Sequence, residues 1–210
     1  MTPSAFRIVE DFLSVQGEGF HSGTFARFVR LAGCNSPALG LDCAEWCDTN
    51  YEDPKWAVNV SAFNNWFEHQ SFTPLLIFTG GEPLLYQNLI REWLITSSLS
   101  ITRVCIETNG TIPRTLDTMK DVWYTVSPKG PEWNLGTGPI SEVKLVITPI
   151  MLLNLQLTLD LMDTMRGNWY HFLQPLDNDL QTAKDIVEQI IARRPSWRLS
   201  LQTHKLISML

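Results

Sequence analysis

The chain has 210 residues, a formal net charge of −6 and 18% charged residues. This length suits one sizeable hydrophobic core, so we expect a single domain over residues 1–210. The basic residues are scattered along a chain that is acidic overall, which excludes a protein whose main task is to grip nucleic acid. The sequence shows no apolar run of membrane-spanning length and no signal-peptide pattern at its start, so we expect a cytoplasmic protein.

The first predicted elements are two strands joined by a turn. A predicted strand over residues 8–14 is followed by a turn in which two glycines flank Glu18. Glycines let the backbone approach another group while the carboxylate points at it. A turn with a solvated glutamate is the plainer interpretation. The second predicted strand, residues 25–31, contains Arg30 among its apolar side chains.

The next stretch is a loop, residues 33–49, that holds three of the four cysteines of the chain, Cys34, Cys43 and Cys47. Three thiols on one loop of a cytosolic protein indicate a metal site rather than disulfides. A structural zinc site has four protein ligands, whereas a four-iron cluster held by three cysteines leaves one iron open to another ligand. A zinc loop completed by an aspartate or a distant histidine, and three unrelated thiols, are the alternatives.

Strand and helix patterns then alternate along the chain. The predicted strands are residues 75–78, 104–106, 122–126, 142–147, 169–173 and 197–201, and the predicted helices are residues 60–70, 84–97, 152–165 and a segment that is capped by Asp177 or Asn178 and ends at Arg194. This alternation favours βαβ units and a parallel sheet with right-handed crossovers. Polar or glycine-rich clusters follow strand after strand, at the edge where α/β proteins bind ligands.

The number of predicted strands limits which α/β folds the chain can form. Six or seven such strands are too few for a full eight-unit barrel, and residues 127–141 show no helical stripe. We therefore expect an α/β protein whose fold is a partial (βα)6-type parallel barrel with some helices missing. An open doubly wound sheet is the alternative.

Several motifs resemble those of a known superfamily. The three cysteines followed by Asp48 and Thr49, together with the segment at residues 80–83 (Gly-Gly-Glu-Pro), resemble the cluster loop and a glycine motif of the radical S-adenosylmethionine (SAM) superfamily. Further segments narrow the resemblance to the 7-carboxy-7-deazaguanine synthase family of the queuosine pathway. These segments are residues 14–19, 27–35, 47–49, 107–110, 127–129 and 202–205. They run in order over most of the chain, so the combination is specific.

The cysteine spacing departs from that of the superfamily. The usual pattern is C-x3-C-x2-C, whereas this chain has C-x8-C-x3-C. The longer first gap enlarges a loop. The additional residue before Cys47 must be absorbed by the backbone if all three thiols are to reach one cluster. Cys105 lies in an apolar strand, where a buried and inert thiol is expected.

The resemblance implies a radical enzyme that uses a [4Fe-4S] cluster, SAM and Mg²⁺. Cys34, Cys43 and Cys47 would hold the cluster, whose open iron binds SAM before it is split to a 5′-deoxyadenosyl radical. In the family, this radical takes a hydrogen atom from 6-carboxy-5,6,7,8-tetrahydropterin, which becomes 7-carboxy-7-deazaguanine with loss of ammonia in a carbon–nitrogen lyase reaction. The expected partners are this small molecule, an electron donor such as flavodoxin or ferredoxin and a second copy in a homodimer, with no nucleic acid and no membrane.

The resemblance and the positions at strand ends suggest a role for each motif residue. The predicted SAM-binding residues are Gly80, Gly81, Glu82, Glu107, Asn109, Ser127, Lys129 and Gln174. The predicted substrate-binding residues are Gln16, Glu18, Arg30 and His204, and Thr49 is the predicted Mg²⁺ ligand with Asp48 behind it. The plainer alternatives are a surface ion pair for Arg30, an ordinary exposed His204 and an ion pair between Glu107 and Lys144.

Two other functions stay open from the sequence. One is a radical SAM enzyme that acts on a different small molecule. The other is a non-catalytic zinc-binding protein on the same scaffold, which the altered cysteine spacing keeps open.

Overall fold

A single sheet is the framework on which the site is built. The structure, a computed structural model, describes residues 3–70, 74–97, 103–116, 122–129 and 135–209. The sheet has nine strands in the order β3-β1-β2-β4-β5-β6-β7-β8-β9. The strands are β1 (Phe6–Val15), β2 (Phe25–Leu31), β3 (Trp56–Val58), β4 (Leu75–Gly80), β5 (Val104–Thr108), β6 (Val122–Val126), β7 (Glu142–Ile147), β8 (Tyr170–Pro175) and β9 (Trp197–Leu199). β1 is antiparallel to β2 and β3, whereas all neighbours from β2 to β9 are parallel.

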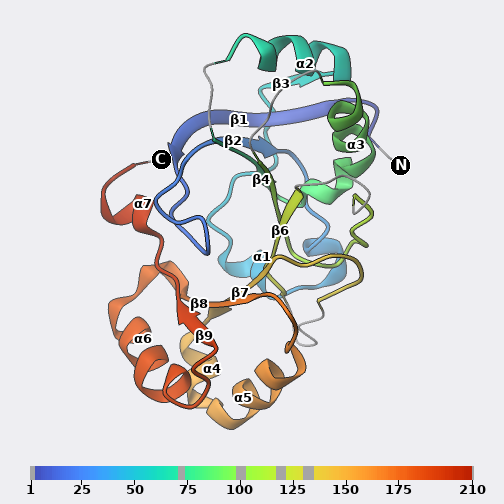
Figure 1. Ribbon diagram of the computed structural model, residues 1–210. Coiled ribbons are helices and arrows are strands. Elements are labelled where there is room, and N and C mark those ends of the chain that lie inside the picture. The colour runs from blue at the N-terminus through green and yellow to red at the C-terminus, as the bar shows by residue number, and fades with distance from the viewer. Residues whose placement is uncertain (1–2, 71–73, 98–102, 117–121, 130–134, 210) are drawn as a thin grey trace.

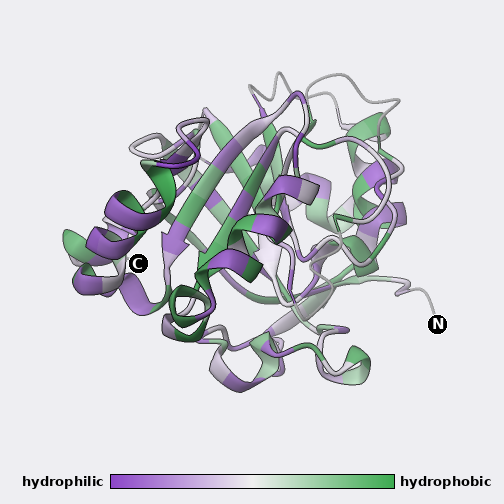
Figure 2. Cartoon of the chain, turned by 90° about the horizontal axis from the view of Figure 1, so that it is seen from below, coloured by the Kyte–Doolittle hydropathy of each residue, from purple (hydrophilic) through white to green (hydrophobic). Residues whose placement is uncertain are grey.

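The longer helices cover the outer face of this sheet, whereas the short α1 and α7 lie at the cavity. The helices are α1 (Cys43–Trp46), α2 (Val60–Glu68), α3 (Gln87–Thr96), α4 (Pro149–Leu153), α5 (Leu155–Thr164), α6 (Leu180–Asp185) with its π-helical continuation (Ile186–Ile191), and α7 (Thr203–Leu206), with 3-10 turns at Pro37–Leu39, Pro83–Tyr86 and Leu176–Asn178. Figure 1 shows α2 and α3 beside the upper strands and α4, α5 and α6 beside the lower ones. In Figure 2 apolar strands lie between these helices, which turn hydrophilic residues outwards. Within the described residues, no helix combines the length and the apolar character of a membrane span.

Side chains alternate between the two faces of the sheet, and this alternation separates the core from the inner face. Val143 and Leu145 of β7 are fully buried in a cluster that includes residues of α5 and the π-helical segment. Glu142 and Lys144 of the same strand point the other way and are also buried. The inner face of the sheet therefore carries charged side chains that are held in place by the strands.

The loop between β1 and β2 crosses the inner face to the last strands. The amide of Phe20 in this loop donates to the Glu142 carboxylate over 2.9 Å. The amide of Thr203, at the start of α7, donates to the carbonyl oxygen of Gly17 over 3.1 Å. These bonds join the first hairpin to the end of the chain, and they bring Glu18 into the interior of the partial barrel.

The predicted partial α/β barrel is confirmed. Seven strands run parallel from β2 to β9, and helices connect β4 to β5, β7 to β8 and β8 to β9. The crossovers from β5 to β6 and from β6 to β7 have no helix among their described residues, 109–116, 127–129 and 135–141. The connection without a helical stripe was therefore correctly identified as far as the structure describes it.

Several helix boundaries differ from the prediction, most clearly in two places. The predicted helix at 152–165 is two helices that meet at Asn154, and the first begins at Pro149, whose ring suits a first helical turn. The cap of α6 is Asp179, which accepts a hydrogen bond from the amide of Thr182 over 2.7 Å. Asp177 and Asn178 have positive φ values of 53° and 61°, so they form the preceding turn, because a helix cap needs extended backbone.

Candidate active site

A cavity of about 610 Å³ opens at the carboxyl ends of the parallel strands. All residues predicted for the site line this cavity, with the exception of Glu82. The lining residues among them are Gln16, Glu18, Arg30, Cys34, Cys43, Cys47, Thr49, Gly80, Gly81, Glu107, Asn109, Ser127, Lys129, Gln174 and His204. The fold thus brings together segments from the first turn to the last helix.

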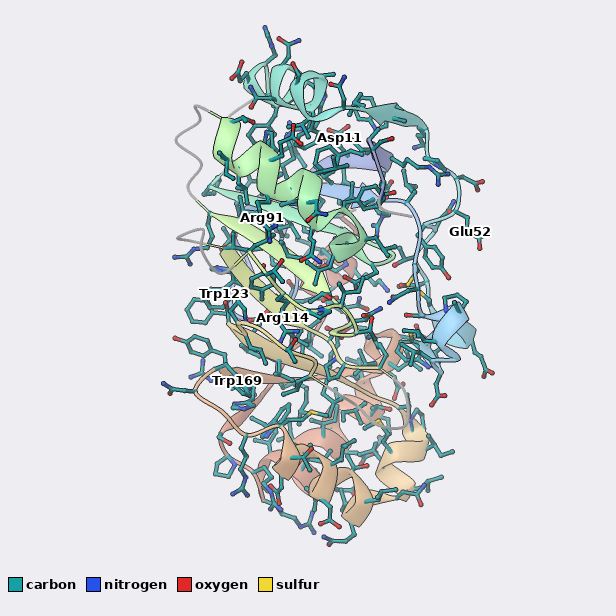
Figure 3. The ribbon with its side chains drawn as sticks, turned by 90° about the vertical axis from the view of Figure 1, so that its right-hand side faces the viewer. Asp11, Glu52, Arg91, Arg114, Trp123 and Trp169 are labelled. Carbon is teal, nitrogen blue, oxygen red and sulfur yellow. The ribbon has the colours of Figure 1, made fainter. Side chains whose placement is uncertain are left out.

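The cysteine loop shows how the unusual spacing is accommodated. The long first gap contains the turn at Pro37–Leu39, which ends at Gly40 with a left-handed φ of 64°. Cys43 is the first residue of α1 and Cys47 directly follows it. Residues four apart on a helical turn share one face, so the additional residue keeps both thiols on the cavity side. Figure 3 shows α1 at the edge of the molecule, below the labelled Glu52.

The three thiols of the cysteine loop border the same cavity. In the part of the chain that the structure describes, no three His, Cys, Asp or Glu side chains are grouped as ligands of a single metal ion. Cys34, Cys43 and Cys47 instead border one cavity as free thiols, which suits a cluster in which each thiolate binds a different iron. Burial raises the pKa of the Cys43 thiol, and the Ser36 hydroxyl and the charge of Lys129 oppose this shift.

Two glycines let the loop after β4 pack against the cysteine loop. Gly80 has a φ of 125°, and a Cβ atom there would overlap the carbonyl oxygen of Leu31. A Cβ atom on Gly81 would overlap the carbonyl oxygen of Gly33 and lie 2.8 Å from Cys34 Cβ. A side chain at position 81 would therefore push the loop that carries Cys34 away from β4, and a side chain at position 80 would push the end of β2 away from β4.

Glu82 lies beneath this loop rather than in the cavity. Its side chain is fully buried, and its carboxylate accepts hydrogen bonds from the Leu84 amide (2.9 Å), the Thr108 hydroxyl (2.9 Å) and the Asn109 amide (2.8 Å). Burial raises the pKa of Glu82 to about 7, although these bonds favour the charged form. The carboxylate thus ties the loop after β4 to the loop after β5.

Glu18 collects polar partners from three distant segments. It forms an ion pair with Lys144 of β7, and its Oε1 atom accepts from Gln202 over 2.8 Å and from Gln174 over 3.2 Å. Burial lowers the pKa of Lys144, while the adjacent carboxylate favours its charged form. A carboxylate has about four lone-pair sites, so these three contacts leave room for one more donor.

Glu107 is held by neutral partners. Its two carboxylate oxygens accept from the Gln16 amide over 2.9 Å and from the Thr79 hydroxyl over 2.8 Å. The Gln16 oxygen accepts in turn from the backbone amide of Glu18 over 3.1 Å. The predicted alternative of an ion pair between Glu107 and Lys144 is not what the structure shows, because Lys144 is paired with Glu18.

Lys129 links the loop after β6 to the cysteine loop. Its ammonium group donates to the Ser127 hydroxyl over 3.0 Å and lies 5.1 Å from the centre of the Trp46 ring. Trp46 lines the cavity beside Cys47. A cation on the face of an indole ring is held electrostatically, so Lys129 is positioned between the thiols and the strand ends.

Arg30 and His204 line the cavity on elements from the two ends of the chain. Arg30 Nε donates to Glu10 Oε1 over 2.6 Å, across the β1–β2 pair, so the ion pair considered as an alternative is present alongside the cavity position. Burial, followed by the charges of Lys205 and Lys144, lowers the pKa of His204. The imidazole of His204 is therefore favoured in its neutral form at neutral pH.

The end of the cysteine loop is tied to α7. Lys205 Nζ lies 2.7 Å from Asp48 Oδ2. Burial would raise the pKa of Asp48, but the hydrogen bond from Lys205 and its charge hold that pKa below its ordinary value. Thr49 follows in the cavity wall.

Sequence reasoning gave no site role to Lys144, Gln202 and Lys205, which also line the cavity. The signal for Lys144 was present: it alternates with Glu142 in an otherwise apolar strand, which indicates a polar inner face. Gln202 and Lys205 flank the predicted His204, but their partners lie far away in the sequence. Spacing alone does not reveal such partners.

Comparison with known proteins gives matches along nearly the whole chain. The model of the Radical SAM superfamily matches residues 45–135. A 7-carboxy-7-deazaguanine synthase of Bacteroides thetaiotaomicron is 36% identical over 97% of this chain and 98% of that protein. One of Bordetella pertussis is 32% identical over 98% of this chain and 99% of that protein. The fold is similar to the crystal structure of QueE from Escherichia coli, with a TM-score of 0.67 and 24% identity over 94% of this chain and 93% of the other.

Proposed function

The chain belongs to the 7-carboxy-7-deazaguanine synthase family of radical SAM enzymes, and we propose that it is a carbon–nitrogen lyase that converts 6-carboxy-5,6,7,8-tetrahydropterin into 7-carboxy-7-deazaguanine with loss of ammonia. The observation that carries this proposal is the shared cavity, where three cysteine thiols and the polar groups around Glu18 face the same space. Such a cavity places a cofactor site next to a site for a small polar substrate. This arrangement supports the queuosine-pathway reaction.

The cysteines hold the cofactor in this proposal. Cys34, Cys43 and Cys47 bind three irons of a [4Fe-4S] cluster and leave the remaining iron for SAM. When bound, the cluster and SAM supply a 5′-deoxyadenosyl radical that removes a hydrogen atom from the substrate. The part of the protein is to position both ligands and to exclude water.

The methionine end of SAM is assigned to two neighbouring loops. Gly80 and Gly81 line the cavity and offer backbone carbonyl groups to its ammonium. Ser127 and Lys129 donate to its carboxylate, and their mutual hydrogen bond holds both donors ready.

The adenosine end is assigned to Glu107 and Gln174, which line the cavity on β5 and β8. Glu82 and Asn109 have their polar side-chain atoms in bonds within the protein. In our proposal these two residues support the SAM site by positioning its loops, not by a side-chain contact to SAM.

The pterin is assigned to the adjacent part of the cavity, around Glu18 and Gln16, which are hydrogen-bonded to Gln174 and Glu107. Glu18 accepts an N–H group of the aminopyrimidinone ring at its remaining lone-pair site, and Gln16 holds the turn on which Glu18 lies. Arg30 and neutral His204 donate to the substrate carboxylate. Thr49 is the proposed Mg²⁺ ligand with Asp48 behind it, since a hard cation prefers oxygen ligands.

The remaining partners follow from this chemistry. We propose a homodimer that receives electrons from a flavodoxin or ferredoxin. The proposed compartment is the cytoplasm, because iron-binding thiols must stay reduced.

Anaerobic reconstitution tests the proposal. The protein is expected to become brown with about four irons per chain, and dithionite, SAM and the carboxytetrahydropterin are expected to yield the deazaguanine product. The variant Glu18→Gln is expected to lose roughly 10- to 100-fold in kcat/KM, since a bond to a charged acceptor is lost. Glu45→Gln, an exposed change on α1, is the control and keeps native activity. Colourless protein with one bound zinc, or loaded enzyme without product, contradicts the proposal.

A further inference from the structure

We infer that the hydroxyl group of Ser36 donates a hydrogen bond to a cluster-binding thiolate and thereby raises the reduction potential of the cluster. Ser36 lies in the long gap between Cys34 and Cys43, and only 3% of its surface is exposed. Its Oγ atom lies 3.3 Å from Cys34 Sγ, and its backbone amide donates to the same sulfur over 3.4 Å. The Cys43 thiol interacts with the same hydroxyl group. The inference rests on the proposed function, because it presupposes the cluster.

Asn109 determines where the Ser36 proton points. Asn109 Nδ2 donates to Ser36 Oγ over 3.2 Å, so the hydroxyl oxygen already accepts a bond. A serine hydroxyl has one proton to donate, and the remaining neighbours are the sulfurs of Cys34 and Cys43. Thiolates bound to iron carry no proton, so in the loaded protein the sulfur accepts and the hydroxyl donates.

The orientation of Asn109 is itself fixed by other bonds. Its Oδ1 atom accepts from the amide of Thr111 over 2.9 Å and from the Thr111 hydroxyl over 2.6 Å, which turns Nδ2 towards Ser36. The backbone amide of Asn109 is held by the buried carboxylate of Glu82. Glu82 thus holds the backbone of Asn109, and Thr111 holds its side chain with Nδ2 directed at Ser36.

The effect on the cluster follows from charge. Reduction adds an electron to the cluster, and a hydrogen bond to a sulfur ligand offsets part of the added negative charge. Hydrogen bonds to the sulfurs are among the factors that set the potential of iron–sulfur clusters. The Ser36 hydroxyl is buried. When it is removed, a water molecule cannot donate an equally strong hydrogen bond to the sulfur.

The test compares the cluster in native protein with that in variants of buried serines. All proteins are reconstituted anaerobically without SAM, poised at one fixed potential and measured by electron paramagnetic resonance. In Ser36→Ala the ratio of reduced to oxidised cluster is expected to fall roughly threefold, about 28 mV at 59 mV per factor of ten. Ser36→Thr retains a hydroxyl and keeps the native ratio. Ser200→Ala also keeps it, because this matched change removes a buried hydroxyl that accepts from the amide of Gly19.

A second readout does not depend on the variant being loaded. Deuterium exchange followed by hyperfine spectroscopy of the reduced native cluster is expected to show two coupled deuterons, from the hydroxyl and the amide of Ser36. If Ser36→Ala does not retain iron, the spectrum of the native protein decides the question. Fewer than two deuterons coupled to the native cluster overturn the inference. A native ratio in fully loaded Ser36→Ala overturns it as well, without touching the proposed function. A native protein that binds no cluster overturns both.

Discussion

Two buried glutamates, Glu82 and Glu142, differ in the partners of their carboxylates. Glu82 accepts from two backbone amides in addition to a hydroxyl. Glu142 accepts from one backbone amide, that of Phe20, and from the Thr125 hydroxyl over 2.7 Å. A hydroxyl can either donate or accept, whereas a backbone amide can only donate. The same substitution is therefore expected to have different consequences at the two sites.

The variant Glu142→Gln is expected to fold with native stability or better at about pH 8. Its amide oxygen can accept from Phe20 while its amide nitrogen donates to Thr125, and no buried charge remains. Glu82→Gln sets an amide nitrogen against a backbone N–H group and is expected to cost about 1–3 kcal/mol. Urea unfolding of both variants measures this difference. Equal losses of stability would show that the hydrogen-bond partners do not decide the outcome.

The buried glutamates are expected to contribute to the free energy of unfolding of the native protein, and this contribution is expected to fall as pH rises through neutrality. Burial raises the pKa of Glu82 and of Glu142 from 4.5 to about 7. Between these values the folded state binds more protons than the unfolded state, so the contribution present below pH 4.5 is lost as pH rises through about 7. Thermal unfolding from about pH 5 to pH 8 measures the slope, which is expected to be shallower in Glu142→Gln. An identical slope in the variant argues against a raised pKa for Glu142.

At the scale of elements, the loop after β4 and the cysteine loop form one unit through close backbone contact. The variant Gly81→Ala is expected to bind markedly less iron after reconstitution, because its Cβ atom meets the Gly33 carbonyl and Cys34. Gly40→Ala is the control in the cysteine loop, where nothing lies within 4 Å of the added atom. Its positive φ costs about 1 kcal/mol of stability but leaves the thiols in place. Equal iron contents in the two variants would contradict this role of Gly81.

Arg114 stabilises a crossover that has no helix among its described residues. Its guanidinium is buried and donates to the carbonyl oxygens of Pro139 (2.6 Å), Leu135 (2.8 Å) and Gly138 (3.1 Å). Figure 3 shows Arg114 near the middle of the molecule, below Arg91. The arginine thus holds the segment before β7 against the loop after β5, where an ordinary barrel would use a packed helix.

The variant Arg114→Met is expected to lose about 2–4 kcal/mol of unfolding free energy, because three carbonyl groups lose a charged donor. Residues 135–139 are expected to become the first site of limited proteolysis. Arg91→Met is the matched control, since this half-buried arginine donates to the carbonyl and the hydroxyl group of the single residue Thr115. It is expected to change stability by less than about 0.5 kcal/mol. Unchanged proteolysis in Arg114→Met would exclude the proposed stabilisation.

At the scale of the whole molecule, the β1–β2 loop and α7, near the end of the described chain, meet at the wall of the cavity. The β1–β2 loop contacts α7 at Gly17, and a Cβ atom there would overlap the His204 imidazole. In Figure 1 α7 lies next to the end of β1. This contact joins the loop of the antiparallel β1–β2 pair to the helix that follows β9, so the cavity wall depends on both segments.

The variant Gly17→Ala is expected to raise KM for the pterin roughly 10- to 100-fold, because a displaced α7 moves His204 from its place in the wall. Iron content and SAM cleavage without substrate are expected to stay native. Gly23→Ala, in the same loop, is the control, because its added atom meets nothing within 4 Å and its φ of 86° imposes only local backbone strain. A native KM in Gly17→Ala would show that α7 does not position a substrate-binding residue.

Most elements and most cavity residues were predictable from the sequence. Strands such as β6 and β7 were located at their observed bounds, because apolar alternation is encoded within a few neighbouring residues. The motif residues at strand ends were expected to share one edge, since parallel strands present their carboxyl ends on the same side. Glu82 was the exception among them: its place beneath the cavity depends on a backbone path that its motif does not encode.

The sequence by itself determined the order of strands and helices, the cysteine loop and the set of polar groups available to a site. Only the tertiary structure decided which groups pair, as when Lys144 joins Glu18 rather than Glu107 and when Ser36 meets two cysteines and Asn109. The physical reason is the separation along the chain over which each interaction acts. Periodicity and capping act between near neighbours, whereas these partners are selected by sheet register and by loops that cross the barrel.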